Sequence, residues 1–282
     1  MKQITGIVTD SAADVPRDFL EKLNISVIPA YINFGLESIP DDGVSISRES
    51  FYQRLRTADP LPTTAAPSPG DAEKALREAL ERYDHVLAIH ITKSLSAIID
   101  SSRIAAESIG SERITVVDTG TLSMGAGWQV IVAAEAAAEG ASPQDIMPIL
   151  ESVRERSRLW AVPATLEYLR RSGRVNGLIA SLGEMLQLKP VIEVEAGKVL
   201  RAGRVRTFKK VIPKLIELAQ GETPLQRLAI LHLDNREGAE NLRRMVQDFA
   251  PSEQTIIVWA SPAIGANFGP GGLALATVRE SR

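Results

Sequence analysis

The sequence predicts an α/β protein with two domains, of which the N-terminal one holds a parallel β-sheet flanked by helices. Up to residue 158, short apolar runs alternate with segments of helical pattern, and this alternation is typical of parallel sheets with crossover helices. Beyond that point a hairpin pattern is mixed with helices, which indicates a C-terminal domain of the α+β class. We expect the N-terminal domain to cover residues 1–155 and the C-terminal domain residues 156–282.

The first half holds four segments with the composition of short strands. These are residues 4–8, 25–34, 85–91 and 113–118. Helical patterns separate and follow them, over about 16–24, 69–83, 96–109, 122–139 and 142–158. Parallel sheets of this kind bind ligands beyond the carboxyl ends of their strands, so we expect the site at that edge.

The second half contains a predicted β-hairpin over 189–205, which turns at Gly197. It is followed by a strand, a helix and a strand over 227–234, 237–250 and 255–260. The segment 263–276 carries a Gly-Pro-Gly-Gly turn, which either closes a pocket or turns the chain into a last strand. Asn267 is the polar side chain of this segment that is best placed to reach inward.

The composition excludes several classes of function. The formal net charge is −3, which gives no electrostatic case for binding nucleic acid. Because the chain has no cysteine, disulfides, thiolate metal sites and cysteine nucleophiles are excluded. The histidines are not spaced as a pair of metal ligands, and no nucleotide-binding loop stands out. We therefore expect neither a metal nor a cofactor.

The sequence shows no sign of membrane insertion or secretion. No apolar run approaches the roughly 18 residues that span a bilayer. The N-terminus has acids where a signal peptide has its apolar core. A soluble, cytoplasmic protein without a transmembrane segment is the expectation.

Residues 61–71, LPTTAAPSPGD, place two hydroxyls just before a helix start. Ser68 can cap this helix, a proline suits its first position, and Asp71 favours the positive end of its dipole. Helix initiation does not account for Thr63 and Thr64, which lie upstream where the backbone is extended. Their hydroxyls either contact a ligand or bond only to local backbone.

A second polar loop follows the segment 85–91 and leads into a helix that we expect to open around Leu95–Ser96. The free N–H groups of a helix N-terminus, together with nearby hydroxyls, suit an anion such as a carboxylate or a phosphate. The alternative is that Ser94 or Ser96 only caps the helix.

Acidic side chains end two of the predicted strands. Asp10, followed by Ser11, ends the first strand, and Asp118 ends the segment 113–118. At this edge Asp10 can orient a ligand hydroxyl or act as a base, or it can form a turn before the next helix. The glycines of 120–127 match neither a dinucleotide fingerprint nor a nucleophile elbow, and we interpret them as allowing close packing of a helix on the sheet.

Two basic clusters lie in the second half, at 170–174 and 201–210. Clusters of this kind are usually solvated faces. The alternative is a surface that docks a partner or contacts phosphate, and its candidates are Arg174, Arg204 and Arg206.

Six motifs, in one order along nearly the whole chain, resemble those of the DegV family of bacterial fatty-acid-binding proteins. They are TDSAADVP, PTTAAPSPGD, ITKSLSAIIDSS, VVDTGTLSMGAG, LEYLRRSGRV and IGANFGPGG. The resemblance implies the EDD fold, in which two α/β-type domains hold the carboxylate of a lipid between them. It also implies an apolar tunnel for the acyl chain, largely in the C-terminal domain. By motif matching, Thr64 and Ser96 correspond to the carboxylate ligands of the family.

The resemblance further implies a carrier and not a catalyst. Such proteins present a bound, palmitate-like fatty acid to a separate ATP-dependent fatty acid kinase that makes acyl phosphate. Asn267 stands where fatty-acid-binding members often carry a histidine, and it can hydrogen-bond a carboxylate but cannot carry a positive charge. Ala65-Ala66 and Ala97 replace a Ser-Gln pair and a glycine, so the anion site is less polar than the family pattern. The apolar stretch 175–188 would line the tunnel or form an ordinary core helix.

An enzyme is the alternative function. A phosphotransferase or hydrolase would use Asp10, Ser11 or Ser96 on a small anionic substrate in the same cleft. Against it stands a sequence with no nucleotide loop, no metal set and no histidine next to a candidate nucleophile. The secondary residues expected around the cleft are Asp10, Ser11, Thr63, Ala97 and Asp118.

Overall fold

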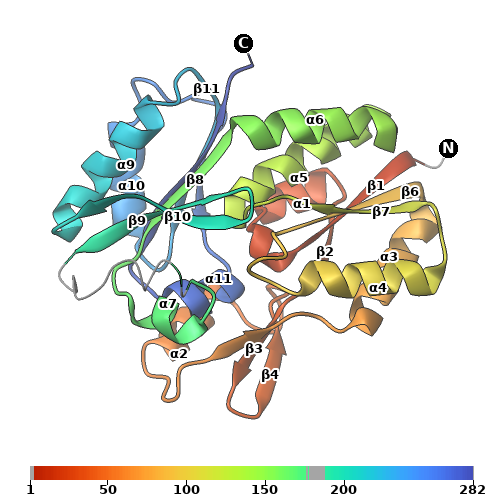
Figure 1. Cartoon of the computed structure of the whole chain (residues 1–282), viewed down its shortest axis with the longest axis horizontal. Coiled ribbons are helices and arrows are strands. Elements are labelled where there is room, and N and C mark those ends of the chain that lie inside the picture. The colour runs from red at the N-terminus through yellow and green to blue at the C-terminus, as the bar shows by residue number, and fades with distance from the viewer. Residues whose placement is uncertain (1–2, 176, 178–187, 282) are drawn as a thin grey trace.

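The computed structural model describes residues 3–175, 177 and 188–281, and it contains two large β-sheets that share one helix (Figure 1). The N-terminal sheet has the strand order β2-β1-β6-β7, and all its strands are parallel. Its strands are β1 (Gln3–Asp10), β2 (Ser26–Ile28), β6 (Tyr83–His90) and β7 (Ile114–Asp118). The predicted parallel sheet is therefore confirmed.

Helices cover both faces of this sheet. Helices α3 (Pro69–Arg82) and α4 (Ile98–Ile109) pack on one face, and α5 (Ser123–Ala138) and α6 (Pro143–Arg156) lie on the other. Successive residues of a strand point to opposite faces, so Val8 of β1 packs with α3 and α4 while Ile7 packs with α5. Both faces are buried, which explains why the strands read as nearly continuous apolar runs.

Two helices begin with a serine cap, which the sequence indicated for Ser68. Ser68 Oγ accepts from Asp71 N at 3.1 Å, and Ser68 N donates to Asp71 Oδ2 at 3.0 Å, which forms a capping box at the start of α3. Ser142 and Asp145 form the same arrangement at the start of α6. Both helices have proline at the first position, where its missing N–H costs nothing.

The segment 25–34, which was expected to form one strand, is divided between two sheets. Its first part is β2, and its last part is β3 (Tyr31–Phe34) of a small antiparallel sheet with the order β4-β3-β5. Pro29 lies between them and cannot donate to a strand ladder, which accounts for the break. The other elements of this region are η1 (Ser11–Ala13), α1 (Arg17–Lys22), β4 (Glu37–Pro40), α2 (Arg48–Leu55) and β5 (Thr63–Ala65).

The second large sheet is mixed and has the order β10-β9-β8-β13-β11-β12. Its strands are β8 (Ser157–Val162), β9 (Lys189–Glu195), β10 (Lys198–Val205), β11 (Leu225–His232), β12 (Thr255–Trp259) and β13 (Leu273–Arg279). The outer face packs against α9 (Val211–Gln220) and α10 (Arg236–Met245). The shorter elements are α7 (Glu167–Ser172), η2 (Phe208–Lys210) and α11 (Pro262–Phe268). The predicted hairpin over 189–205 is confirmed as β9 and β10.

Helix α5 belongs to the core of both sheets. It contacts β1 on one side and β8, β11 and β13 on the other. Trp128, which is fully buried, donates its indole Nε1–H to Ala276 O at 3.2 Å and so ties the helix to the middle of the mixed sheet. The turn of the β9–β10 hairpin also contacts the N-terminal half, since Gly197 N donates to Gly120 O at 2.7 Å. One continuous apolar core therefore spans both sheets and frames the space between them.

Candidate functional site

A cavity of about 220 Å³ lies between the two halves of the molecule. Its walls come from β5, the loop before α4, the start of α5, the inner face of the mixed sheet, α7 and α11. Most of the lining is apolar. The polar side chains that line it are Thr64, Ser96, Ser123, Ser172, Arg174 and Asn267.

Four residues in register across the mixed sheet form an apolar wall of this cavity. Ile192 of β9 pairs with Ala161 of β8, Ala161 pairs with Ala274 of β13, and Ala274 pairs with Leu231 of β11. All four line the cavity. Paired residues of neighbouring strands face the same side of a sheet, so the two small alanines leave a hollow between two larger side chains.

Thr64, Asn267 and Arg174 are joined by hydrogen bonds in the cavity wall. Asn267 Nδ2 donates to Thr64 Oγ1 at 3.2 Å and to Ala263 O at 2.8 Å. Asn267 Oδ1 accepts from Arg174 Nη1 at 2.5 Å, and Arg174 Nε donates to Leu95 O at 3.0 Å. Segments far apart in the sequence therefore meet here.

Ser96 lines the same cavity, two residues before the first residue of α4. The helix begins at Ile98 with Ala97 as its N-cap, two residues later than the sequence suggested. Ser96 Oγ accepts from Ile98 N at 3.3 Å, whereas the side chain of Ala97 cannot cap. The first amides of a helix lack intrahelical partners. In α4 these amides follow Ala97, which is exposed and also lines the cavity.

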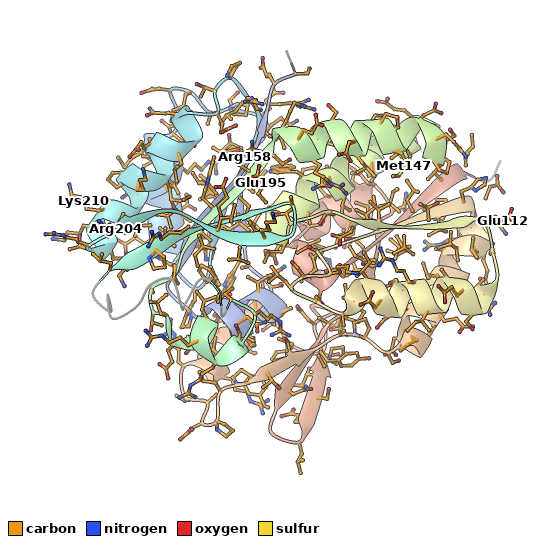
Figure 2. The ribbon with its side chains drawn as sticks, in the orientation of Figure 1. Glu112, Met147, Arg158, Glu195, Arg204 and Lys210 are labelled. Atoms are coloured by element: carbon orange, nitrogen blue, oxygen red, sulfur yellow. The ribbon has the colours of Figure 1, made fainter. Side chains whose placement is uncertain are left out.

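Arg174, a candidate for the docking surface together with Arg204 and Arg206, is exposed in the structure and also reaches the cavity. Its guanidinium lines the cavity and bonds to the loop before α4 and to α11. Partial burial lowers the pKa of Arg174, yet an arginine stays charged at neutral pH. Arg204 lies on β10 at the end of the hairpin opposite the turn, as Figure 2 shows. Arg206 directly follows that strand.

Asp10 is a buried structural residue. Its Oδ1 accepts from Ala12 N at 3.1 Å, and its Oδ2 accepts from Ile91 N at 3.0 Å. His90 Nδ1 lies 3.0 Å from Asp10 Oδ2, and His90 Nε2 lies 2.8 Å from Ser102 Oγ.

A histidine does therefore lie next to a candidate residue, contrary to the prediction from sequence, because His90 contacts Asp10 and also Ser102. The Asp10–His90–Ser102 arrangement has the connectivity of a catalytic triad. However, His90 and Ser102 are 0% exposed and Asp10 is 1% exposed. Ser102 does not line the cavity, so a substrate in that cavity does not reach its hydroxyl. The network ties β1 and β6 to α4.

The remaining secondary residues lie around the cavity without contacting it, apart from Ala97. Ser11 Oγ accepts from Ala30 N at 3.1 Å. Asp118 Oδ1 accepts from Gly120 N at 2.8 Å and its Oδ2 from Lys93 N at 3.2 Å, which fixes the loops at the end of β7 and β6. Thr63 is exposed and is not part of the cavity lining. The stretch 175–188, predicted as tunnel lining or core helix, lies largely outside the described residues, although Val175 does line the cavity.

Two buried carboxylates hold α11 against the N-terminal half. Asp14 Oδ1 accepts from Ser261 N at 2.7 Å, and Asp41 Oδ2 accepts from Ala263 N at 3.0 Å. Burial, together with the neighbouring charge of Asp14, raises the pKa of Asp41 to about 6 against the opposing effect of the hydrogen bond from Ala263. Because α11 carries Asn267, these carboxylates position one wall of the cavity.

The raised pKa of Asp41 predicts a specific dependence of stability on pH. The folded state disfavours the ionised carboxylate of Asp41, which lowers the free energy of unfolding above about pH 6. This penalty decreases as the pH falls from about 6 towards the unfolded value of 3.8, because the folded state then binds the proton first. Asp41→Asn keeps the acceptor oxygen but has no ionisable group. We expect the free energy of unfolding of the variant, minus that of wild type, to be about 1–2 kcal/mol larger at pH 8 than at pH 5. Urea unfolding at both pH values measures this difference. A constant difference would show that Asp41 does not titrate in this range.

Within the described parts of the chain, no group of three or more histidine, aspartate or glutamate side chains is placed to hold a metal ion. Nor is any helix described there both long and apolar enough to cross a bilayer.

Comparison with known proteins supplies the evolutionary context. The model of the DegV family, described as uncharacterised proteins, matches residues 5–280. A DegV domain-containing protein of Deinococcus radiodurans is 39% identical over 212 residues, which cover 75% of each chain. A DegV family protein of Thermus thermophilus, whose structure is described as showing fatty acid binding, is 33% identical, with a TM-score of 0.90 over 99% of this chain and 100% of that one. A Thermotoga maritima protein, whose structure is described as revealing fatty acid binding function, is 27% identical, with a TM-score of 0.87 over 99% and 100%.

Proposed function

Because this chain belongs to the DegV family, we propose that its cavity binds a long-chain fatty acid. The observation that carries the proposal is an apolar cavity whose wall includes an arginine, four hydroxyls and an amide. The Thermus and Thermotoga proteins, with nearly the same fold, are described as binding fatty acids. The acyl chain occupies the apolar part of the cavity against the mixed sheet, and the carboxylate lies at Thr64, Ser96, Asn267 and Arg174.

The two parts of such a ligand need different surroundings. Burying a methylene group gains about 0.8 kcal/mol, so a long acyl chain supplies most of the affinity. A carboxylate loses its hydration on entry and needs charge-assisted hydrogen bonds in return. Arg174 has five N–H donors, of which those on Nε and Nη1 make the two bonds to protein. The guanidinium as a whole supplies the positive charge that Asn267 lacks, and its remaining N–H groups donate to the carboxylate.

The role is that of a carrier. The polar part of the cavity offers hydroxyls, an amide and a guanidinium, but the buried Asp10–His90–Ser102 network is out of reach of a ligand there. The bound acid is presented to a separate fatty acid kinase in the cytoplasm, and Arg204 and Arg206 on the β10 side belong to the docking surface. All strands of the mixed sheet come from residues after 156, which supports dividing the chain into domains 1–155 and 156–282.

Native mass spectrometry of protein purified without added lipid tests this function. A co-purifying long-chain acid, identified after organic extraction, is the expected result. Protein that emerges empty is then mixed with palmitate, which is expected to raise its unfolding temperature because a ligand that binds only the folded state stabilises it. No extracted acid together with no thermal shift would refute fatty-acid binding.

Thr64→Val is expected to weaken palmitate binding by roughly 3- to 10-fold, because it removes one neutral hydrogen-bonding group and nearly preserves the side-chain shape. The matched control is Thr63→Val, since Thr63 is the adjacent residue of the same strand but is not in the cavity lining. Titration calorimetry of both variants measures the effect. Equal affinities for the two variants would remove Thr64 from the carboxylate site.

A further inference from the structure

A second cavity, of about 400 Å³, lies at the carboxyl ends of β11 and β12. Its lining residues are His232, Asp234, Arg236, Glu240, Arg243, Ile257 and Trp259. None of them lines the first cavity, to which the same strand ends contribute Leu231, Leu233 and Ala260 instead. This is the alternation of a β-strand, which points successive side chains to opposite faces. The ends of β11 and β12 therefore contribute to two separate cavities, one on each face of the mixed sheet.

His232 places a hydrogen-bond donor at this second cavity. The side chain is nearly buried, at 5% exposure, and its Nδ1 accepts from Asn235 N at 3.4 Å. A ring nitrogen that accepts carries no proton, so the proton of the neutral ring is on Nε2. No described residue accepts a hydrogen bond from Nε2, and His232 is part of the cavity wall.

Aromatic stacking holds this imidazole in position. Trp259 is stacked on His232 with a centroid distance of 5.6 Å and an interplanar angle of 25°, and Tyr52 is stacked on Trp259 at 5.7 Å and 17°. The indole Nε1 of Trp259 is buried and has no acceptor among the residues that the structure describes. Of these two rings, only His232 presents its N–H to the cavity, because the Trp259 Nε1 atom is enclosed.

Among the charged residues of this lining, Arg243 is the one for which the described residues provide no ion pair. Asp234 is paired with Arg56, and Glu240 lies 3.7 Å from Arg236. Arg243, which is exposed, makes no ion pair within the described parts of the chain. The cavity also faces the start of α10, a helix of 10 residues capped by Asn235, where unpaired amides favour an anion.

We propose that this second cavity binds a phosphate-type oxyanion, held by His232 Nε2–H, Arg243 and the start of α10. The parallel pair β11 and β12 with α10 between them is the arrangement in which α/β sheets bind ligands, beyond the carboxyl ends of the strands. The anion is either free phosphate or a phosphate carried on a small organic molecule. The site does not depend on fatty-acid binding, because the two cavities share no lining residue.

Tryptophan fluorescence tests the proposal directly. Trp128 and Trp160 are 0% and 3% exposed and line neither cavity, so a ligand at the second cavity is expected to change the emission of Trp259. Inorganic phosphate and, separately, glycerol 3-phosphate are titrated into the full chain, with sodium chloride keeping the ionic strength constant. A saturable change with at least one of them is the expected result, and the tighter of the two shows whether the anion is free or carried.

Substitutions distinguish a specific binding site from non-specific electrostatic attraction. Arg243→Ala is expected to weaken the response roughly tenfold, since it removes a charge-assisted contact from an exposed position that does not support the fold. Arg244→Ala is the matched control, because Arg244 is the exposed neighbour on the same helix but does not line the cavity. His232→Phe keeps a ring against Trp259 and is expected to abolish binding. No saturable change, or equal affinity in wild type and Arg243→Ala, would overturn the proposal, whereas palmitate affinity is expected to stay unchanged in all three variants.

Discussion

Arg174→Ala is expected to weaken palmitate binding by about 10- to 100-fold, more than the loss of either hydroxyl. A hydrogen bond to a charged group contributes about 1.5–3 kcal/mol, against about 1 kcal/mol for a neutral pair. Arg174 is the one charged side chain in the cavity lining that the structure describes, so its removal leaves the carboxylate without a counter-charge. It also takes away the donor that orients Asn267 Oδ1.

Titration calorimetry with palmitate measures this loss, and Arg171→Ala is the matched control. Arg171 lies in α7, three residues before Arg174, but its side chain is 57% exposed and paired with Glu167 on the surface. The methyl ester of palmitate separates charge from packing, since it keeps the acyl chain and has no negative charge. Arg174→Ala is expected to bind the ester as wild type does. If Arg174→Ala retained wild-type affinity for the acid, the carboxylate would have to lie elsewhere in the cavity.

Local signals in the sequence predicted most of the fold. Ser68 and Ser142, each followed by proline and an acid, gave the starts of α3 and α6, and Gly197 gave the turn between β9 and β10. These features act within a few residues of the chain, so a single sequence carries them completely. The division of 25–34 between two sheets depends instead on which strand pairs with which, and that is decided by distant segments.

The candidate site was predicted only in part for the same reason. Thr64 and Asn267, both predicted as ligands of one carboxylate, are hydrogen-bonded to each other although they are 203 residues apart. Arg174 is exposed, as its basic cluster suggested, but it also lines the cavity and bonds to Leu95, 79 residues away, and no local pattern predicts that contact. His90 and Ser102 are brought together by the packing of α4 on the sheet, which no local pattern reveals.

Filling the hollow in the mixed sheet is expected to have the largest effect on ligand binding. Ala274→Phe places a ring at the centre of the row formed by Ile192, Ala161, Ala274 and Leu231, where the two alanines leave space. If the ring excludes about five methylene groups of the acyl chain, at about 0.8 kcal/mol each, the loss is about 4 kcal/mol, or roughly 1000-fold in affinity for palmitate. The carboxylate contacts are untouched.

Titration with a series of saturated fatty acids of increasing length measures how this loss of affinity depends on chain length. Octanoate, whose shorter chain needs less of the cavity, is expected to bind Ala274→Phe nearly as well as wild type, and the deficit is expected to grow with each added methylene. Ala202→Phe on β10 is the control, because Ala202 packs with the outer cluster beneath α9 and α10 and does not line the cavity. A folded Ala274→Phe variant that bound palmitate as tightly as wild type would place the acyl chain away from this row of the sheet. A uniform loss at every chain length would instead indicate that the ring disturbs the carboxylate end, because only an obstruction along the chain discriminates by length.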